Sequence, residues 1–463
     1  MAQAPLLSTP LRQLAQQLES RTRTGEELVE AAIDAAKTGD HGAYVSWRPE
    51  SALELARAGD KVRAAGGNTG PLMGIPVSVK DLFGVPGFPT YAGCSRALPE
   101  HWQQTGPLIH ALQSQLAPVV GKTHCVELAF GGLGTNSHWG TPRNPWDKRV
   151  HRVPGGSSSG AGVSLINETA ALALGTDTAG SVRVPATMTG VAGLKLTAGR
   201  WPTSQIVPLS STLDTPGLLA HRVDDLAYAF SALDPVVGKQ GRQLPAVPVL
   251  ASLTFGVPSA FFWEDCSPGI AEIVEQALMS LERAGARLVR FDFSGLNEIY
   301  GLFLQGGVAA PELAAFIRQE LPEIMPALDP NVAARLRTAG ELPAWEYIHR
   351  LDLIKRLSVS AATELQGIDA LLTPTVTLTP PAVDSLDEPG AYAAANMQAL
   401  RNTAMANYLG LCGLTLPVGK DKAGMPVGLQ LLKGPWQEGR LLAIGQAVER
   451  CLGFGPDILG SCP

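Results

Sequence analysis

The sequence has few charged side chains, and its basic residues form no run. Charged residues make up 17% of the 463 residues, with 36 Lys and Arg against 42 Asp and Glu, so the formal net charge is −6. Proteins that bind nucleic acid usually carry a basic patch or stripe, so we expect no nucleic-acid partner. Hydrophobic residues make up 45% of the chain, which predicts a globular protein with a large core.

Residue patterns typical of metal sites are also missing. The six cysteines form no CxxC pair, and the eight histidines form no HxxxH or HExxH pair. Such pairs supply the ligands of many zinc sites, so we expect no metal and no other cofactor. The irregular cysteine spacing, with no signal peptide at the N-terminus, predicts reduced thiols and a cytoplasmic location.

Long hydrophobic runs are absent as well. The most apolar stretch, residues 161–174, is interrupted by Asn167 and Glu168. It is also shorter than the roughly 20 residues of a membrane-spanning helix, so we expect no membrane segment.

Periodicity and turn residues predict alternating helices and strands along most of the chain. The second N-terminal helix is expected to begin with a capping box formed by Thr24 and Glu27. A further helix is expected to begin at Ser267 and Pro268, between two strands, and this order favours a mixed or parallel sheet with helices on its faces. We predict helices over 9–38 (two), 49–65, 105–116, 161–166 and much of 296–367, and strands over 75–79, 119–122, 170–174, 253–257, 286–291, 368–372 and 414–418.

Two loops rich in glycine each contain a candidate serine. The first is Gly155–Gly160, with serines at 157, 158 and 159. A flexible linker or a phosphate-binding loop explains it, although the Gly-Lys-Ser/Thr ending of a Walker motif is missing. It also fits a nucleophile elbow centred on Ser158, but that motif needs an apolar strand directly before it. The preceding residues, 151–154, are polar and broken by a proline, which disfavours the elbow.

The second loop lies 24 residues further along and ends at Ser181. Small residues precede this serine, so successive backbone N–H groups can converge on one oxygen atom as in an oxyanion hole. A tight turn with Ser181 as a helix N-cap explains the same pattern.

Lys80 ends the mostly apolar run 74–79. A lysine at a strand end usually extends to water, whereas burial lowers the pKa of the ammonium group. Only a neutral lysine can act as a base. A buried Lys80 and two loop serines would together make a nucleophilic centre that uses no histidine.

At this point the chain resembles a known family, the amidase signature amidohydrolases. The segments 154–160, 173–186 and 190–195 resemble the amidase signature itself. Further blocks in the family's order lie at 74–81, 121–123, 140–146, 371–375 and 424–430, so that the resemblance covers about 10–450.

The resemblance implies an α/β fold in which helices cover both faces of a large, mixed, mostly parallel, twisted sheet. It implies a single domain over 1–463. Its expected parts are N-terminal helices (1–68), a signature core (69–225), a variable substrate-specificity region (226–370) and a C-terminal part of the core (371–463).

The resemblance also assigns roles to individual residues. Ser181 is the expected nucleophile, Ser157 the bridging serine after a cis peptide bond, and Lys80 the base. The expected oxyanion hole consists of the backbone N–H groups of Thr178, Ala179, Gly180 and Ser181. Many relatives have glycine where this chain has Ala179, and some ureide-cleaving relatives share the Ala-Gly-Ser form.

Several nearby residues have two interpretations. Arg183 either contacts a carboxylate of the substrate or pairs with Asp177 to brace the loop. By resemblance, Ala129, Phe130 and Gly131 line the acyl side of the pocket, although Phe130 equally suits the core. His138 and His151 either border the site or lie on solvated loops.

These features predict hydrolysis of a linear carboxylic amide to an acid and ammonia or an amine. The substrate is expected to be a small aliphatic, aryl or ureide amide. The alternatives are the amidase subunit of a glutamine-dependent amidotransferase and a catalytically silent binding protein. Specificity is expected in 200–215 and 296–350, where Phe303, Phe316, Trp345 and Tyr347 suit either an apolar pocket or helical packing. The N-terminal helices are a candidate contact of a homodimer.

Overall fold

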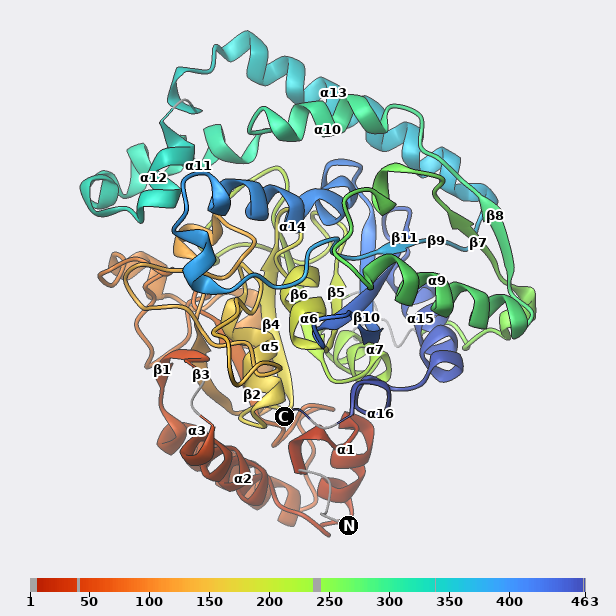
Figure 1. The fold of residues 1–463 in the computed structure, drawn as a ribbon. Helices are drawn as coiled ribbons and strands as arrows, with labels where there is room; N and C mark the ends of the chain where they lie inside the picture. Colours follow the sequence, from red (N-terminus) through yellow and green to blue (C-terminus); the bar gives the residue numbers. More distant parts are fainter. Residues whose placement is uncertain (1–5, 40–41, 236–242, 338, 461, 463) are drawn as a thin grey trace.

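One mixed sheet of eleven strands runs through the centre of the protein (Figure 1). The computed structural model describes residues 6–39, 42–235, 243–337, 339–460 and 462. The strand order in the sheet is β1-β3-β2-β4-β6-β5-β10-β11-β9-β7-β8. The strands are β1 (Tyr44–Trp47), β2 (Val77–Lys80), β3 (Val119–Thr123), β4 (Leu172–Asp177), β5 (Ala192–Lys195), β6 (Thr215–Ala220), β7 (Thr254–Val257), β8 (Arg287–Arg290), β9 (Ala370–Pro374), β10 (Cys412–Lys420) and β11 (Pro426–Lys433).

The sheet is mixed, as expected, but the expected excess of parallel pairings is wrong. Parallel pairs occur at its two ends, where β2 lies between β3 and β4, and β7 lies between β8 and β9. Every pairing from β4 through β6, β5, β10 and β11 to β9 is antiparallel, and so is that of β1 with β3. The strand directions had been taken from the family resemblance, and of this central block the sequence analysis predicted β4, β9 and β10 but not β5, β6 or β11.

Side chains that alternate along the strands pack against helices on both faces of the sheet. Ala173 and Leu219 pack with α5 (Ser159–Ile166) and α6 (Arg183–Thr189) on one face. Their neighbours Leu174 and Leu218 point to the other face, into the main core. This alternation has the period of two that a strand imposes. The helices of that second face are α7 (Val223–Leu233), α9 (Ile270–Arg283) and α15 (Glu438–Leu452).

The N-terminal helices lie together at the bottom of Figure 1. They are α1 (Leu11–Glu19), α2 (Gly25–Thr38) and α3 (Pro49–Ala64), and the expected capping box of Thr24 and Glu27 is present at the start of α2. The leucines of α1 are buried, and this helix packs against α7. That apolar face is therefore occupied within the chain, and a homodimer through these helices stays a prediction.

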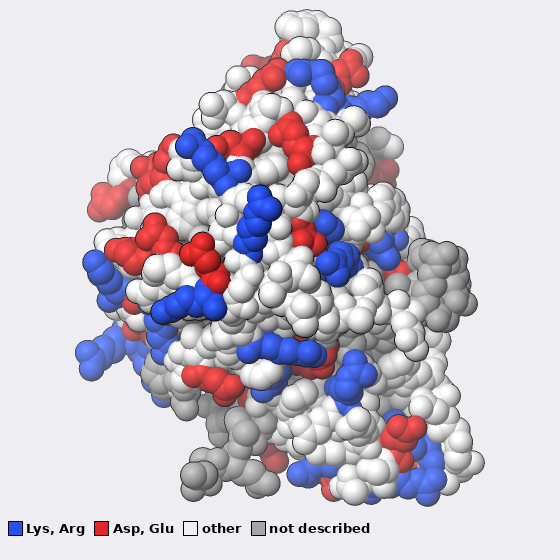
Figure 2. All heavy atoms as spheres, turned by 90° about the vertical axis from the view of Figure 1, so that its right-hand side faces the viewer, with Lys and Arg blue, Asp and Glu red and all other residues white. Residues whose placement is uncertain are grey.

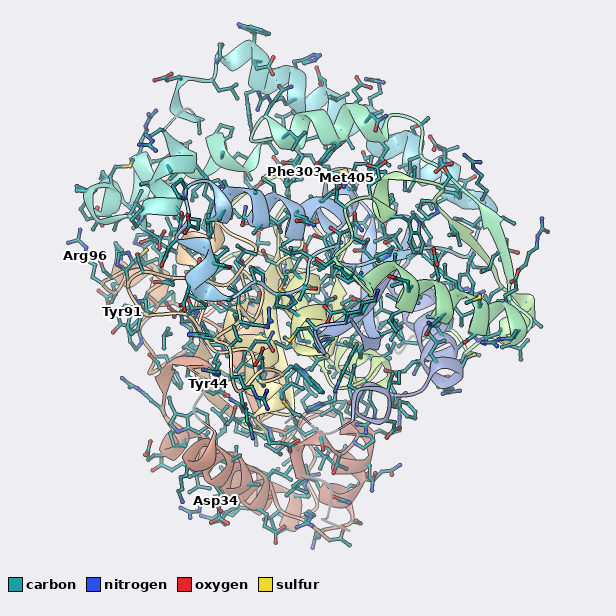
Figure 3. The ribbon with its side chains drawn as sticks, in the orientation of Figure 1. Asp34, Tyr44, Tyr91, Arg96, Phe303 and Met405 are labelled. Carbon is teal, nitrogen blue, oxygen red and sulfur yellow. The ribbon has the colours of Figure 1, made fainter. Side chains whose placement is uncertain are left out.

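A layer of helices at the top of Figure 1, which we call the helical cap (residues 296–364), covers α14 (Ala391–Tyr408). In the labelled view, Phe303 of α10 and Met405 of α14 lie next to each other within one hydrophobic cluster (Figure 3). This layer closes one side of the site described below. The cap helices are α10 (Leu296–Leu304), α11 (Ala309–Glu320), α12 (Pro330–Leu336) and α13 (Ala344–Glu364).

One stretch of the cap resembles a membrane span by length and composition. An 18-residue window within residues 296–320 has a mean hydropathy of 1.2, and the sequence expectation had overlooked this stretch in favour of 161–174. Such a stretch is weak evidence, because core helices of soluble proteins pass the same test. Here Gly306 and Gly307, both with positive φ, separate it into α10 and α11. We interpret the stretch as two helices that pack onto the protein.

Some local expectations from the sequence were wrong. The strand β6 was missed because Pro216 and Gly217 lie inside it, and such residues usually argue against a central strand. The helix expected to begin at Ser267 begins at Ile270, with Gly269 as its N-cap. The remaining helices are α4 (Pro107–Ser114), which was expected, and α16 (Gly455–Leu459).

Charges of both signs are interspersed over the face shown in Figure 2. On that face Lys and Arg side chains lie among Asp and Glu side chains rather than in a patch of one sign. A surface of this kind offers no concentrated positive field of the sort that draws in nucleic acid.

Candidate active site

Lys80 is a fully buried lysine at the end of β2. Its Nζ lies 2.7 Å from Ser157 Oγ and 2.8 Å from Thr176 Oγ1. Burial penalises the charged ammonium and lowers the pKa of Lys80 to about 8, although Cys125, Asp214 and Asp177 oppose the shift. With this pKa roughly a tenth of the Lys80 side chain is neutral at pH 7, far more than for an ordinary lysine, and a base requires the neutral form.

A second buried lysine on the neighbouring strand has a different environment. Lys122 of β3 lies 2.9 Å from the Asp81 carboxylate, and both side chains are fully buried. It also donates to Thr90 Oγ1 at 3.1 Å. Lys80, by contrast, forms no ion pair with any described residue. Lys122 is paired with a carboxylate and Lys80 is not, within the described residues, so Lys80 is the candidate base.

The two candidate serines lie at the N-terminal ends of neighbouring helices. Ser157 precedes α5, follows a cis peptide bond from Gly156 and is fully buried. Ser181 precedes α6 and is 3% exposed. The amide of Ser158 donates to the carbonyl of Ser181 at 3.3 Å, which joins the two loops. Within the described residues, the hydroxyls of Ser157 and Ser181 form no hydrogen bond with each other.

Asp177 and Arg183 brace the loop that carries Ser181. The Arg183 guanidinium is fully buried and bonds to both carboxylate oxygens of Asp177, at 2.9 and 3.1 Å. It also donates to Gln430 and Asn407. Burial alone raises the pKa of Asp177, but the positive charge and hydrogen bonds of Arg183, with help from Lys195 and Asn407, lower it to about 2. Of its two interpretations, Arg183 fits the bracing one and not contact with a substrate carboxylate.

One of the four backbone N–H groups of the expected oxyanion hole is already hydrogen-bonded within the protein. The amide of Gly180 donates to Asp177 Oδ1 at 2.8 Å, so in this structure it is already engaged. Gly180 has a φ of 135°, and a Cβ at this position would overlap the Thr403 hydroxyl. That hydroxyl donates to the carbonyl of Ala179 at 2.7 Å. The loop therefore needs glycine at 180, and the proposal below rests on the amides of Thr178, Ala179 and Ser181.

A cavity of about 220 Å³ opens beside Ser181. This is smaller than the pockets of about 300–1,000 Å³ that hold drug-sized ligands, which favours a small substrate. Its walls come from the signature core, from α14 and from the helical cap. The lining residues are Ala129, Phe130, Gly131, Thr178, Ala179, Ser181, Leu209, Leu213, Phe303, Leu304, Gly306, Ala309, Ala310, Arg335, Met397, Leu400 and Tyr408.

Of the four aromatic residues suggested for the specificity pocket, only Phe303 lines this cavity. Phe316 packs edge-on against Trp102 at 5.5 Å between ring centroids. Trp345 is 70% exposed. Tyr347 lies at a different hollow and donates to Glu312 at 2.7 Å. Helix packing and solvent exposure thus account for three of the four.

Three residues around the site were missed by the sequence reasoning. Thr176 is the second oxygen partner of Lys80, and its place two residues after Leu174 on β4, on the same face of the strand, was an available signal. Asp214 accepts hydrogen bonds from the Thr178 hydroxyl and from the amides of Leu209 and Ser210, which shapes the cavity wall. Burial raises the pKa of Asp214 to about 6. Arg335 lines the cavity from α12, and no local pattern marks it.

Histidines and metal ligands take no part in the cavity. His138 bonds to Glu127 at 3.1 Å and His151 to the carbonyl of Thr141 at 3.0 Å, and neither lines the cavity. Burial lowers the pKa of His124 to about 4, so this histidine is neutral. No group of three or more His, Cys, Asp or Glu side chains suited to a metal ion occurs among the described residues.

Comparison with known proteins agrees with this geometry. The model of the family described as Amidase matches residues 27–442. The chain is 52% identical over 419 residues to the 2-amino-5-chloromuconic acid deaminase of Comamonas testosteroni, covering 90% of each. It is 32% identical over 474 residues to the mandelamide hydrolase of Pseudomonas putida, covering 94% of this chain and 90% of that one. A crystal structure of an amidase superimposes with a TM-score of 0.87 at 30% identity, covering 96% of this chain and 100% of that one.

Proposed function

The chain belongs to the amidase family and is an amidohydrolase acting on C–N bonds of linear amides, and we propose that it works through an acyl-enzyme on Ser181. In this proposal Lys80 is the base and Ser157 relays the proton between them. The observation that carries it is the burial of Lys80 without an ion-pair partner among the described residues, with Ser157 Oγ 2.7 Å from its Nζ.

The first step forms a tetrahedral intermediate on Ser181, which becomes the acyl-enzyme when the C–N bond breaks. Neutral Lys80 accepts the proton of Ser157 while Ser157 accepts the proton of Ser181, and Ser181 Oγ attacks the amide carbonyl. Catalytic hydrogen bonds often tighten only when substrate is bound, so the Ser181 and Ser157 hydroxyls need not be bonded in the empty site. The amides of Thr178, Ala179 and Ser181 hold the developing oxyanion.

The second step releases the products. The proton held by the relay passes to the leaving nitrogen, the C–N bond breaks, and ammonia or an amine departs. A water molecule then gives a proton to the relay and attacks the ester carbonyl on Ser181. The acid leaves, and the relay returns that proton to Ser181, so each proton that the relay takes up is given back within the cycle.

Direct detection of the acyl group tests this proposal. A slowly hydrolysed ester or anilide, mixed with the enzyme and quenched in acid, should add the mass of its acyl group to one peptide containing Ser181. The Ser181→Ala protein should show no such addition, while the exposed Ser204→Ala control should label like the wild type. Labelling of Ser157 or Ser158 in place of Ser181 would overturn the assignment.

The leaving group is proposed to be ammonia. One relative, 52% identical, is named a deaminase and another, 32% identical, is named a mandelamide hydrolase. Both names are consistent with a substrate that is a small primary amide or an amino acid derivative. The amidotransferase-subunit alternative has less support, since it needs a partner that accepts ammonia. Release of free ammonia by the isolated chain from such amides separates the two, and a strict requirement for a second protein would favour the subunit.

A further inference from the structure

The helical cap places a single cationic side chain against the cavity. Of the described residues that line it, Arg335 on α12 is the only lysine or arginine, and the wall around it is largely apolar. Its guanidinium lies 3.7 Å from the centroid of the Phe130 ring. Its Nη1 donates to the Phe130 carbonyl at 2.8 Å. The side chain is therefore held in a definite position beside a residue of the opposite wall.

Arg335 has no carboxylate partner among the described residues. Two carboxylates at the start of α12 are committed elsewhere. Asp329 accepts the amides of Ser137 and Asn331, and Glu127 bonds to His138 and to the amide of Asp329. An arginine has five N–H donors, and one hydrogen bond to a carbonyl leaves most of them free. Several buried polar side-chain atoms of the described residues have no hydrogen-bond partner, and none of these atoms belongs to Arg335.

Arg183 and Arg335, two arginines near Ser181, therefore differ in the partners of their guanidinium groups. Arg183 has a carboxylate, an amide and a second amide oxygen around its guanidinium. Arg335 is half-buried, and desolvation lowers its pKa, with only Tyr392 and Tyr408 acting in the opposite direction. A desolvated cation without a counter-charge is costly, and an anion that enters beside it relieves that cost. The guanidinium fork matches a carboxylate in particular.

We propose that Arg335 binds a carboxylate carried by the acyl part of the substrate, so that the preferred substrates are monoamides of small dicarboxylic acids. The acyl side follows from the bond between Arg335 and Phe130, since residues 129–131 are the expected acyl wall. A short apolar chain between amide and carboxylate suits the leucine, alanine and phenylalanine side chains around it. This inference rests on the proposed acyl-enzyme mechanism for the position of the amide.

Matched pairs of amides test it, each pair differing only by a carboxylate in place of a methyl group. Suitable pairs are glutaric acid monoamide with pentanamide, adipic acid monoamide with hexanamide, and muconic acid monoamide with 2,4-hexadienamide. For at least one pair, wild-type kcat/KM should favour the acid by at least about tenfold, the size expected of a charge-assisted contact. Equal or better cleavage of every neutral amide would overturn the proposal.

Substitution of the arginine sharpens the test. Arg335→Met should reduce the acid-to-neutral ratio of kcat/KM by about tenfold or more, and Arg335→Lys should keep part of it. Arg337→Met removes the same charge from an exposed position two residues away and should leave the ratio at the wild-type value. An unchanged ratio in Arg335→Met, or an equal fall in Arg337→Met, would contradict a direct contact. If Arg335→Met does not fold, the Arg335→Lys ratio decides in the same way.

A binding measurement separates this inference from the mechanism. Calorimetric titration of the same pairs into Ser181→Ala needs no turnover, so it reports on Arg335 even if Ser181 is not the nucleophile. The acids should bind at least about tenfold more tightly than their neutral partners, and a further Arg335→Lys change should weaken the acids alone. Equal binding within every pair would overturn the role of Arg335 and leave the proposed role of Ser181 standing.

Discussion

The cavity has two walls of different character, one from the signature core and one from the helical cap. The core wall carries Ser181 and the amides beside it. Behind it lie two buried, hydrogen-bonded pairs, Lys80 with Ser157 and Asp177 with Arg183. The cap wall carries Phe303 and Leu304 on α10 and Arg335 on α12. The first arrangement can do chemistry on any amide that fits, and the second can decide which amide fits.

This difference predicts two classes of mutant. A change in the core wall should lower kcat/KM for all substrates by a similar factor, because it removes stabilisation of a transition state they share. A change in the cap wall should alter the ranking of substrates, because it changes contacts that only some of them make. The following predictions test that division.

The largest effect is expected from Ser181→Ala. Removal of a nucleophile typically costs about 10⁴-fold or more in kcat, and here it should do so for acid and neutral amides alike. Ammonia release measured across the matched pairs checks this, with Ser204→Ala as the control. Retention of substantial activity toward any one substrate would mean that the core wall does not supply a common nucleophile.

The two buried lysines should separate chemistry from stability. Lys80→Met removes the base and should lower kcat/KM by about 10³-fold or more. Lys122→Met instead leaves the Asp81 carboxylate buried without its partner, which typically costs about 3–5 kcal/mol of stability. Thermal unfolding and kcat/KM should therefore be measured together on both proteins.

The unfolding temperatures and activities of the two lysine variants can contradict this contrast. Lys80→Met should unfold at a higher temperature than Lys122→Met, because burial already disfavours the charged form of Lys80. If Lys122→Met is as stable as the wild type but inactive, the assignment of the base to Lys80 alone is wrong.

The core wall was largely predictable from the sequence because its function depends on short local patterns. Glycines around Ser157 and Ser181 and an apolar run before Lys80 are visible within a few residues each. The detail that escaped was the Gly180 amide, whose bond to Asp177 depends on how the carboxylate of that residue turns within the folded loop.

The cap wall was not predictable in the same way. Arg183 lies within the signature segment 173–186, whereas no local pattern marks Arg335, and the role of each depends on the distant partners it meets. Arg183 meets Gln430 and Asn407, more than 200 residues away, whereas Arg335 meets no carboxylate among the described residues. No short sequence pattern marks an arginine that has no carboxylate partner in the folded protein. The same holds for Phe303 and Phe316, which lie on neighbouring helices and face different surroundings.

The pH dependence of the reaction should follow Lys80. Its pKa is lowered to about 8, so the side chain is protonated and inactive as a base below that pH and neutral above it. The value of kcat/KM, which reports the free enzyme, should rise with pH through about 8 and fall about tenfold per unit below it. The slope should be the same for acid and neutral amides, since it arises in the core wall. A flat profile down to about pH 5 would remove Lys80 as the base.

The smallest effect is expected from substitution of Phe303, and it should be a change in the ranking of substrates. Phe303 lines the cavity and packs edge-on against Tyr408 at 6.0 Å between ring centroids. Phe303→Leu enlarges the cap wall, so kcat/KM for a bulky acyl group relative to a small one should rise by a few-fold to about tenfold, within the range that hydrophobic contacts allow. Phe316→Leu removes a similar volume from a ring that packs on Trp102 outside the cavity and should leave the ratio unchanged. If Phe303→Leu instead lowers both rates by one common factor, the cap contributes to the shared chemistry and the division between the two walls fails.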